Sequence, residues 1–448
     1  MQNTNNTPHI AQADAVVIGG GLAGLTAACY LAKSGAAVTL YEKAAGLGGR
    51  AATREHDGFY FNRGIHAVYT GGAMSEVLAE LGITYHYGVP EGAEVLDGST
   101  LRPLPTGPIG LLRSDLLTWK DKLELVRIFT KLPRIDARAL ARVSVKQWLD
   151  RTIRRPQVLR LFRSIARVFV YSDALDLVSA EVFVAKLQIT LKHPVHYVDH
   201  GWQSIVDGLR RAAEQAGGRI VGGTDVAAIT VNDGRVAAVV LDDGSTVDTR
   251  SVVVATAPHD AATLIGASAS PSFRAAIDAL VPAKVACLDV ALRRLPAPDH
   301  PIVQDLDRPL FFSAQSRFAD IAPKGRALIH VFKQLDPRRP TDPHDDERDL
   351  ESLLDAAQPG WRDAVVRRVY LPRITAVGTL PTARGGGFAG RPGVQSTGIA
   401  GLYLAGDWVG PEGFLSDPSF ASARRAAKLI TKTRRSSPPS RTLAGVAR

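Results

Sequence analysis

The chain has 448 residues, of which 45% are apolar and 22% are charged, as in globular proteins large enough for two domains. This composition excludes a fibrous or wholly disordered protein. Two distant cysteines, Cys29 and Cys287, exclude a disulfide framework, a zinc cluster and a C-x-x-C redox pair. We therefore expect a cytoplasmic protein in a reducing compartment, without a metal site.

The net charge of +10 is unevenly distributed. Sixteen basic and five acidic residues lie between Arg102 and Arg167, and eight basic residues and no acid follow Asp417. These segments lack interleaved aromatic residues and a known reader motif, so we do not expect nucleic acid as a partner. Two interpretations stay open: a solvated helical face, or peripheral contact with the anionic inner face of a membrane.

The chain opens with a strand, a glycine-rich turn and a helix. Ala15–Ile18 is apolar and rich in valine, as in a buried parallel strand, and a helical pattern runs on to Ser34-Gly35. The turn has the spacing G-x-G-x-x-G, which permits close approach of a pyrophosphate to the backbone and to the start of the helix. The expected phosphate contacts are Gly19, Gly21, Leu22, Ala23 and Gly24.

A second strand, Val38–Tyr41, closes the βαβ unit and is followed by Glu42. A carboxylate at this place accepts hydrogen bonds from an adenosine ribose and repels a 2′-phosphate. The unit therefore indicates FAD or NAD rather than NADP. We include the adjacent Lys43 among the expected cofactor contacts.

A second glycine motif, Gly46-Leu47-Gly48-Gly49-Arg50, separates FAD from NAD. It places small residues and one guanidinium, those of Gly48, Gly49 and Arg50, beside a second phosphate. Together with Glu42 it closely resembles the flavoprotein superfamily that includes amine oxidases and phytoene desaturases. The resemblance implies FAD as the cofactor.

Further segments are similar to the same superfamily. Arg63-Gly64-Ile65-His66 resembles the segment that passes beside the isoalloxazine ring, and Gly201–Ser204 resembles the re-entry into the FAD domain. Val226 matches the position whose backbone contacts adenine.

The resemblance extends to the C-terminal part of the chain. Gly401–Asp407 resembles the C-terminal flavin motif, in which an acid, here Asp407 after Gly406, binds the ribityl or pyrophosphate region. The following helix, entered near Leu415 and Ser416, would direct its positive end at the flavin N1–C2=O region and stabilise reduced flavin.

The rest of the pattern predicts alternating regions of helix and strand. Residues 110–190 are expected to be mostly helical, and 226–256 to form a β-meander and a buried strand. Strands at Val285–Leu292 and Ala327–Phe332 and helices at Glu347–Ala357 and Ser419–Ile430 are expected further on. Residues 1–13 and 431–448 are expected to be disordered tails.

We therefore expect an α/β fold with a Rossmann-type, glutathione-reductase-like FAD-binding domain and an interleaved α+β substrate domain. The FAD-binding domain would comprise residues 1–95, 200–265 and 386–435. The substrate domain would comprise a mostly helical part, 96–199, and a second part, 266–385, and residues 436–448 would form a basic tail.

A second match to the dinucleotide pattern, Gly385-x-Gly387-x-x-Gly390, follows no clear strand, and Pro392 and Gly393 prevent a helix behind it. We interpret it as a loop. No dedicated NAD(P)H site is then expected, and the electron acceptor would be oxygen, a quinone or another protein.

Candidate catalytic residues follow from the expected position of the ring. His66 titrates near neutrality and is the candidate base, the alternative being that it only packs against the flavin. Arg63 would bind a carboxylate or phosphate, or form an internal salt bridge. Trp408 and Phe414 would line the substrate cavity or pack in the core, and Lys333 is a weaker candidate.

The resemblance implies an FAD-dependent dehydrogenase, desaturase or oxidase that moves a hydride from a C–C or C–N bond of a lipophilic small molecule to flavin N5. Two alternatives remain. The same scaffold supports redox-neutral isomerases such as UDP-galactopyranose mutase, and binding proteins without catalysis such as the Rab GDP-dissociation inhibitors.

Overall fold

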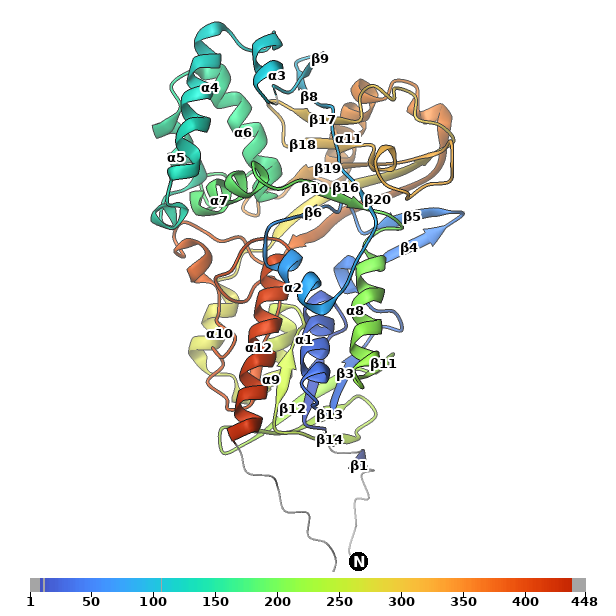
Figure 1. Ribbon diagram of the computed structural model, residues 1–448, viewed down its shortest axis with the longest axis vertical. Helices are drawn as coiled ribbons and strands as arrows, with labels where there is room; N and C mark the ends of the chain where they lie inside the picture. Colours follow the sequence, from blue (N-terminus) through green and yellow to red (C-terminus); the bar gives the residue numbers. More distant parts are fainter. Residues whose placement is uncertain (1–8, 11–12, 106, 437–448) are drawn as a thin grey trace, which may run out of the picture.

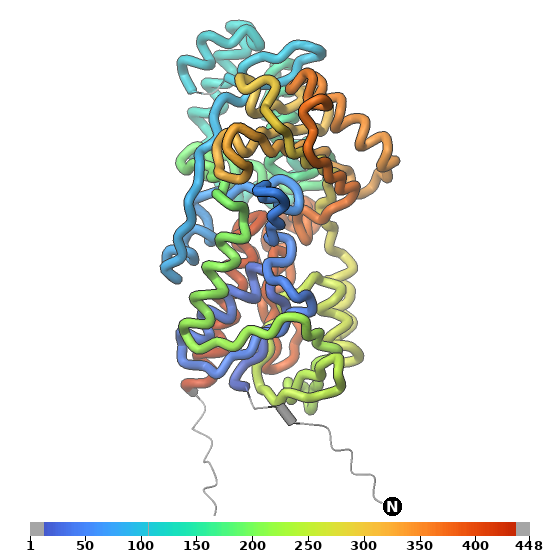
Figure 2. The backbone as a smooth tube through the Cα atoms, turned by 90° about the vertical axis from the view of Figure 1, so that its right-hand side faces the viewer, coloured from blue at the N-terminus to red at the C-terminus, as the bar shows by residue number. Residues whose placement is uncertain are grey.

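The computed structural model describes residues 9–10, 13–105 and 107–436. The molecule is elongated, and Figure 1 shows a parallel sheet with three long helices in its lower part and a larger sheet with most other helices in its upper part. A view turned by 90° shows the same two parts stacked along the long axis (Figure 2).

The lower part is built on a five-stranded parallel sheet with the order β11-β3-β2-β15-β21. Its central strands are almost wholly apolar because both faces of a parallel sheet are covered. The helices α1, α8 and α12 pack side by side against it (Figure 1). The bounds are Ala15–Ile18 (β2), Val38–Glu42 (β3), Arg219–Gly222 (β11), Val252–Val254 (β15), Leu402–Leu404 (β21), Leu22–Lys33 (α1), Gln203–Gln215 (α8) and Asp417–Ser436 (α12).

A four-stranded sheet with the order β1-β14-β13-β12 shares the hydrophobic core of this part. It contains the expected meander, whose tight turn places Asp233 and Gly234 at positive φ. The bounds are Val226–Asn232 (β12), Arg235–Leu241 (β13) and Thr246–Asp248 (β14). One expectation was wrong: His9–Ile10 (β1), assigned to a disordered tail, pairs in parallel with the free edge of β14.

The upper part is built on a seven-stranded sheet with the order β20-β16-β19-β18-β17-β8-β9. Helix α11, Pro343–Ala357, packs on β16, β18 and β19. The strands are Ala93–Asp97 (β8), Thr100–Pro103 (β9), Ala283–Leu292 (β16), Ile302–Asp305 (β17), Leu310–Ser313 (β18), Ala327–Gln334 (β19) and Val365–Val377 (β20).

The predicted helical region between residues 110 and 190 is confirmed. Two of its helices begin with capping boxes, made by Thr118 with Asp121 and by Ser144 with Gln147, which satisfy their free N–H groups. The helices are Gly107–Arg113 (α3), Trp119–Lys131 (α4), Val145–Thr152 (α5), Pro156–Val170 (α6) and Ala180–Thr190 (α7). Of these, α3 and α4 lie at the end of the molecule farthest from the last turn of α12, and α7 lies nearer the middle (Figure 1).

The remaining helices and strands are short. They are Thr53–His56 (β4), Phe59–Asn62 (β5), Val68–Tyr69 (β6), Tyr87–Gly88 (β7), Val195–Val198 (β10), Ala73–Leu81 (α2), Pro258–Ile265 (α9) and Pro271–Asp278 (α10). The domain limits given above stay predictions.

The C-terminal helix is longer than expected. Residues 431–436, assigned to a tail, continue α12, because buried Ala427 and Ile430 anchor it and Arg434 pairs with Asp14 at 2.7 Å. The rest of that predicted tail, 437–448, lies outside the described residues, as do 1–8 and 11–12 of the N-terminal one. Within the described residues, no helix combines the length and hydropathy needed to cross a bilayer.

Candidate functional site

The first glycine turn joins β2 to α1, and its geometry requires glycine. Gly19 has φ +106°, and a Cβ at Gly24 would overlap the carbonyl oxygen of Gly19. The helix begins at Leu22 after Gly21, and no side chain caps its free N–H groups. A phosphate fits there, because the uncapped N–H groups and the positive end of α1 together bind anions.

The carboxylate of Glu42 at the end of β3 is fixed to this turn. One of its oxygens accepts from the N–H of Gly20 at 2.6 Å, and the other accepts from that of Ala44 at 2.9 Å. The segment before Val226 lies beside it, since the N–H of Thr224 donates to the Glu42 carbonyl at 3.1 Å. The turn expected at the pyrophosphate and the two segments expected around the adenosine thus come together. The next residue, Lys43, is exposed.

The second glycine turn lies against the first. The N–H of Gly48 donates to the carbonyl of Gly20 at 2.8 Å, and Gly21 and Gly48 form a β-bridge. Gly48 and Gly49 both have positive φ, and a Cβ at Gly49 would lie 3.8 Å from the Cα of Gly21. The two glycine turns are therefore in direct contact beside the start of α1.

Arg50 and Asp407 connect the two ends of the chain across this place. The guanidinium of Arg50 donates two hydrogen bonds of 2.7 Å to the carboxylate of Asp407, which also accepts from the N–H of Gly378 at 2.6 Å. Burial alone would raise the pKa of Asp407, but the Arg50 charge and these hydrogen bonds lower it. Asp407 is held as a carboxylate.

The segment from Arg63 to His66 passes close to β16 and β20. Gly64 has φ +83°, and a Cβ there would lie 2.6 Å from Ile374. Ile65 packs against the core of the helical region. Arg63 is exposed and has no ion-pair partner among the described residues.

Both ring nitrogens of His66 face main-chain carbonyls. Nδ1 lies 3.0 Å from the oxygen of Gly64 and Nε2 3.1 Å from that of Arg50. The ring also packs edge-on against Trp202 at 5.1 Å between centroids. Burial lowers the pKa of His66, although the two carbonyls oppose this. Neither nitrogen is free to accept a proton from a substrate in this arrangement.

The C-terminal motif leads from β21 into α12. Gly406 has φ +156° and lies against the indole of Trp408, whose Nε1 donates to Thr256 at 3.0 Å. Trp408 is buried in the core of the lower part, so of its two predicted roles the structure favours packing. Leu415 has positive φ, and the hydroxyl of Ser416 lies 3.1 Å from the sulfur of Met74.

Asp417, the first residue of α12, is buried. Its carboxylate accepts from the N–H of Met74 at 3.0 Å and so replaces the N-terminal cap that Gly72 cannot supply to α2. Burial raises the pKa of Asp417 to about 6, although the Met74 N–H and the charge of Lys186 oppose the rise.

Lys186 is a buried lysine that was not among the residues expected from the sequence. Its Nζ lies 3.5 Å from the ring centroid of Tyr69 and has no hydrogen-bond partner among the described residues. Burial lowers its pKa well below the ordinary value, and the charge of Asp417 opposes this. The rings of Phe169, Tyr171 and Phe414 also surround it, at 5.5–5.9 Å. One feature of the sequence points to this residue, since it is the lone lysine in the apolar run VFVAKL of α7.

Two further sequence candidates lie elsewhere. Lys333, the weaker candidate, pairs with Asp346 at 2.8 Å and with Asp349 at 2.5 Å, both on α11, which favours a structural role. The second glycine pattern forms a 3₁₀ turn, Gly387–Gly390, whose Phe388 N–H donates to Glu181 at 2.9 Å. That turn packs on α7.

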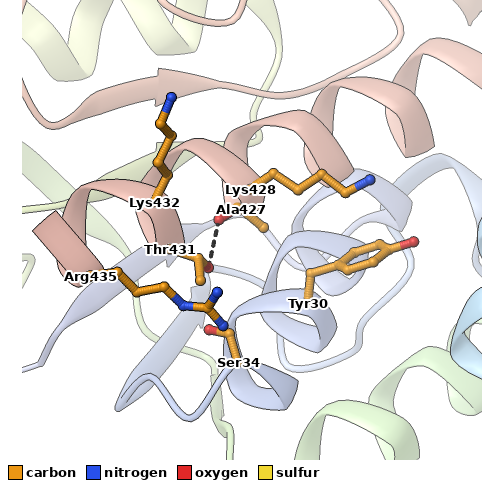
Figure 3. A pocket seen from close by; sticks show the side chains of 7 residues that line it. All are labelled: Tyr30, Ser34, Ala427, Lys428, Thr431, Lys432 and Arg435. Atoms are coloured by element: carbon orange, nitrogen blue, oxygen red, sulfur yellow. Dashed lines mark hydrogen bonds between the residues drawn. The ribbon is translucent and has the colours of Figure 1, made fainter.

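A surface depression of about 440 Å³ lies between α1 and α12, away from the glycine turns. Figure 3 shows its lining, with Thr431 bonded to Ala427 and three basic side chains around it. It is formed by the last turns of both helices, so it is not the place where the phosphate-binding end of α1 meets Glu42. The lining residues are Tyr30, Ser34, Ala427, Lys428, Thr431, Lys432 and Arg435.

Comparison with known proteins agrees with this geometry. The family described as flavin containing amine oxidoreductase matches residues 22–431. A carotenoid 3,4-desaturase of Haloarcula japonica is 59% identical over 51 residues, 11% of this chain and 10% of the relative. A phytoene desaturase of Cercospora nicotianae is 31% identical over 126 residues, 28% of this chain and 19% of the relative. The matched stretches thus span a fifth or less of these relatives.

Solved structures share the fold over nearly the whole chain. An oxidoreductase from Methanosarcina mazei superposes with a TM-score of 0.76 at 18% identity, covering 92% of this chain and 99% of its own. Cyclohexylamine oxidase from Brevibacterium oxydans gives a TM-score of 0.71 at 16% identity, covering 95% and 100%. The Rossmann-type α/β fold is thereby confirmed. The chain belongs to the flavin-containing amine oxidoreductase family.

Proposed function

We propose that this oxidoreductase dehydrogenates a C–C bond, or else a C–N bond, of a lipophilic small molecule and passes the electrons to oxygen, a quinone or another protein. The observation that carries the proposal is the junction of Arg50 with Asp407, which joins the two ends of the chain beside uncapped α1. Bound FAD supplies hydride acceptance at flavin N5.

Different residues around this junction contact different parts of the cofactor. The first turn holds the pyrophosphate, Glu42 the ribose, and the adjoining β3 and β12 segments the adenine. The second turn and Asp407 hold the second phosphate and the ribityl chain, and the segments 64–66 and 415–416 adjoin the ring. The proposed contacts are Gly19, Gly21, Leu22, Ala23, Gly24, Glu42, Lys43, Gly48, Gly49, Arg50, Gly64, Ile65, His66, Val226, Gly406, Asp407, Leu415 and Ser416.

Lys186 is proposed as the group that takes the substrate proton. Its amine is buried, unpaired and near Phe414 and Asp417, which directly flank the proposed ring contacts 415–416. Burial lowers the pKa of this amine, which favours the neutral form that can accept a proton.

The aromatic rings around Lys186 favour a neutral, apolar substrate. Such rings bind ammonium groups through their faces, but here the face of Tyr69 is already taken by the protein's own amine. A cationic amine substrate would first have to displace this amine from the ring.

His66 is proposed to fix the segment beside the ring rather than to act as the base, because both its nitrogens face carbonyls. Arg63, exposed and without an ion-pair partner among the described residues, is proposed to bind an acidic group at the surface.

The test is anaerobic mixing of the holoenzyme with a polyene precursor in detergent micelles and, separately, with a primary amine. Loss of the visible flavin band with the polyene is the expected result. Bleaching by the amine alone would overturn the preference for a C–C bond. A flavin bleached by dithionite but by neither class would contradict the proposed substrates.

A further inference from the structure

The helical end of the molecule carries a concentration of exposed apolar side chains. Five of the nine large apolar residues that are exposed within the described chain lie between residues 109 and 126. Their exposed fractions run from 48% to 65%. They are Ile109 and Leu112 of α3 and Trp119, Leu123 and Val126 of α4.

On α4 these side chains form one stripe. Trp119, Leu123 and Val126 are spaced four and three residues apart, so they share a face of the helix. The opposite face, with Leu125 and Ile128, is buried in the core of the helical region. The stripe therefore faces outward, and the side chains that fill the core are different ones.

Basic side chains flank the stripe. Arg113, Lys120, Arg127 and Lys131 are all exposed, and none has an ion-pair partner among the described residues. Lys122 donates to the carbonyl of Leu112 at 2.7 Å and so ties α3 to α4.

The acids of this segment are engaged elsewhere. Asp121 is buried and pairs with Arg155 at 2.8 Å, and Glu124 accepts from the N–H groups of Arg154 and Arg155, both at 2.9 Å. Asp115 pairs with Arg102 at 2.6 Å. The outward charge of α3 and α4 is thus positive.

We infer that α3 and α4 dock the protein on a bilayer that contains anionic lipids. We call the five apolar residues and Arg113, Lys120, Arg127 and Lys131 the docking face. An exposed apolar stripe with flanking cations is what an interfacial helix needs, since the stripe enters the acyl boundary and the cations meet the lipid phosphates.

The position of the docking face in the molecule is compatible with contact with a bilayer. It lies at one end of the long axis, away from the last turn of α12 (Figure 1). The same helical region contains α7 with Lys186. The docking does not depend on the substrate proposed above, and either can fail without the other.

The fluorescence of Trp119 can report contact between the docking face and a bilayer. Of its five tryptophans, Trp119 is exposed and the other four are buried. The holoenzyme is titrated with vesicles of phosphatidylcholine alone or mixed with phosphatidylglycerol. With the anionic vesicles the emission should shift to the blue and become protected from acrylamide, and added salt should reverse this. Trp119→Phe should remove the signal while sedimentation with the vesicles persists.

Paired variants test the two components of the docking face. Leu112→Ser with Leu123→Ser should weaken vesicle binding about tenfold per leucine. Lys120→Gln with Arg127→Gln should weaken it about fivefold per cation. The controls, Leu191→Ser with Val366→Ser and Arg294→Gln with Lys324→Gln, change exposed residues elsewhere and should leave binding unchanged. All variants should keep the flavin content and thermal midpoint.

Two results would overturn the inference. One is vesicle binding that is absent, or equally reduced by the controls. The other is a concentration-dependent dimer, seen by sedimentation velocity without lipid, that Leu112→Ser with Leu123→Ser dissociates. The face would then join two copies of the chain.

Discussion

Arg50 and Asp407 are 357 residues apart in the sequence and share two hydrogen bonds of 2.7 Å. About half of the Arg50 side chain is accessible (49%), whereas Asp407 is almost fully buried (5%). The pair holds the second glycine turn on the end of β21. Of its two members, only Asp407 is shielded from solvent.

Removal of Arg50 alone should destabilise the fold more than removal of both charges of the pair. Arg50→Ala leaves the buried carboxylate of Asp407 with Gly378 as its remaining partner and should destabilise the protein by about 3 kcal/mol. Arg50→Ala with Asp407→Asn should recover much of that loss, because no buried charge is left unpaired. A double-mutant cycle from urea unfolding measures this. Additive losses would show that the two side chains do not interact.

Gly24→Ala should abolish flavin binding. A methyl group there overlaps the carbonyl of Gly19, so α1 must move away from β2 and its N–H groups leave the phosphate site. Gly393→Ala is the control, since a Cβ there has no neighbour within 4 Å. Flavin content per chain and dissociation constants compare the two variants. A Gly24→Ala protein with full flavin content would contradict the assignment.

Asp417 should make stability depend on pH. Its pKa rises from an ordinary value of 3.8 to about 6 in the fold, so its protonated form is favoured in the native state. The raised pKa therefore adds to the stability of the fold. This stabilisation is fully present below pH 3.8 and is lost as the pH rises through about 6. Asp417→Asn, which keeps an acceptor for Met74, should therefore gain thermal stability relative to the wild type between pH 4 and 7. A difference in thermal stability between the variant and the wild type that is equal at every pH would contradict the raised pKa of Asp417.

Lys186→Met should separate catalysis from stability. Methionine fills the same volume without burying an unpaired amine, so the fold should be at least as stable. Flavin reduction by substrate should slow by a factor of about 10² to 10⁴ if the amine takes the proton. Lys333→Met is the matched control. It leaves buried Asp346 without the lysine and should lower stability by about 3 kcal/mol with an unchanged reduction rate. Stopped-flow reduction and urea unfolding distinguish the two.

The elements around the cofactor could be predicted because each carries its own local signal. The apolar run of β2, the glycine turn and the glycine after α1 specify a βαβ unit within thirty residues, and the structure has it with β2 at the predicted bounds. The long amphipathic helix α6 lies within the region expected to be mostly helical, and its buried residues recur at helical spacing.

The missed strands lack such signals. β20 carries paired arginines on a half-exposed edge, and β17 has only four residues. Both are strands because their neighbours in the seven-stranded sheet complete their hydrogen bonds. The lone lysine of α7 is visible in the sequence, but the rings around it are not, since Tyr69, Phe169 and Phe414 are distant in sequence and meet only through packing.

The most direct test of the central claim is the visible absorption spectrum of the purified protein, with the flavin counted after release. Our account predicts one FAD per chain, a flavin band in the folded protein, and its loss on anaerobic addition of a substrate. A correctly folded protein that contains no flavin, and takes up none when FAD is added, would contradict it.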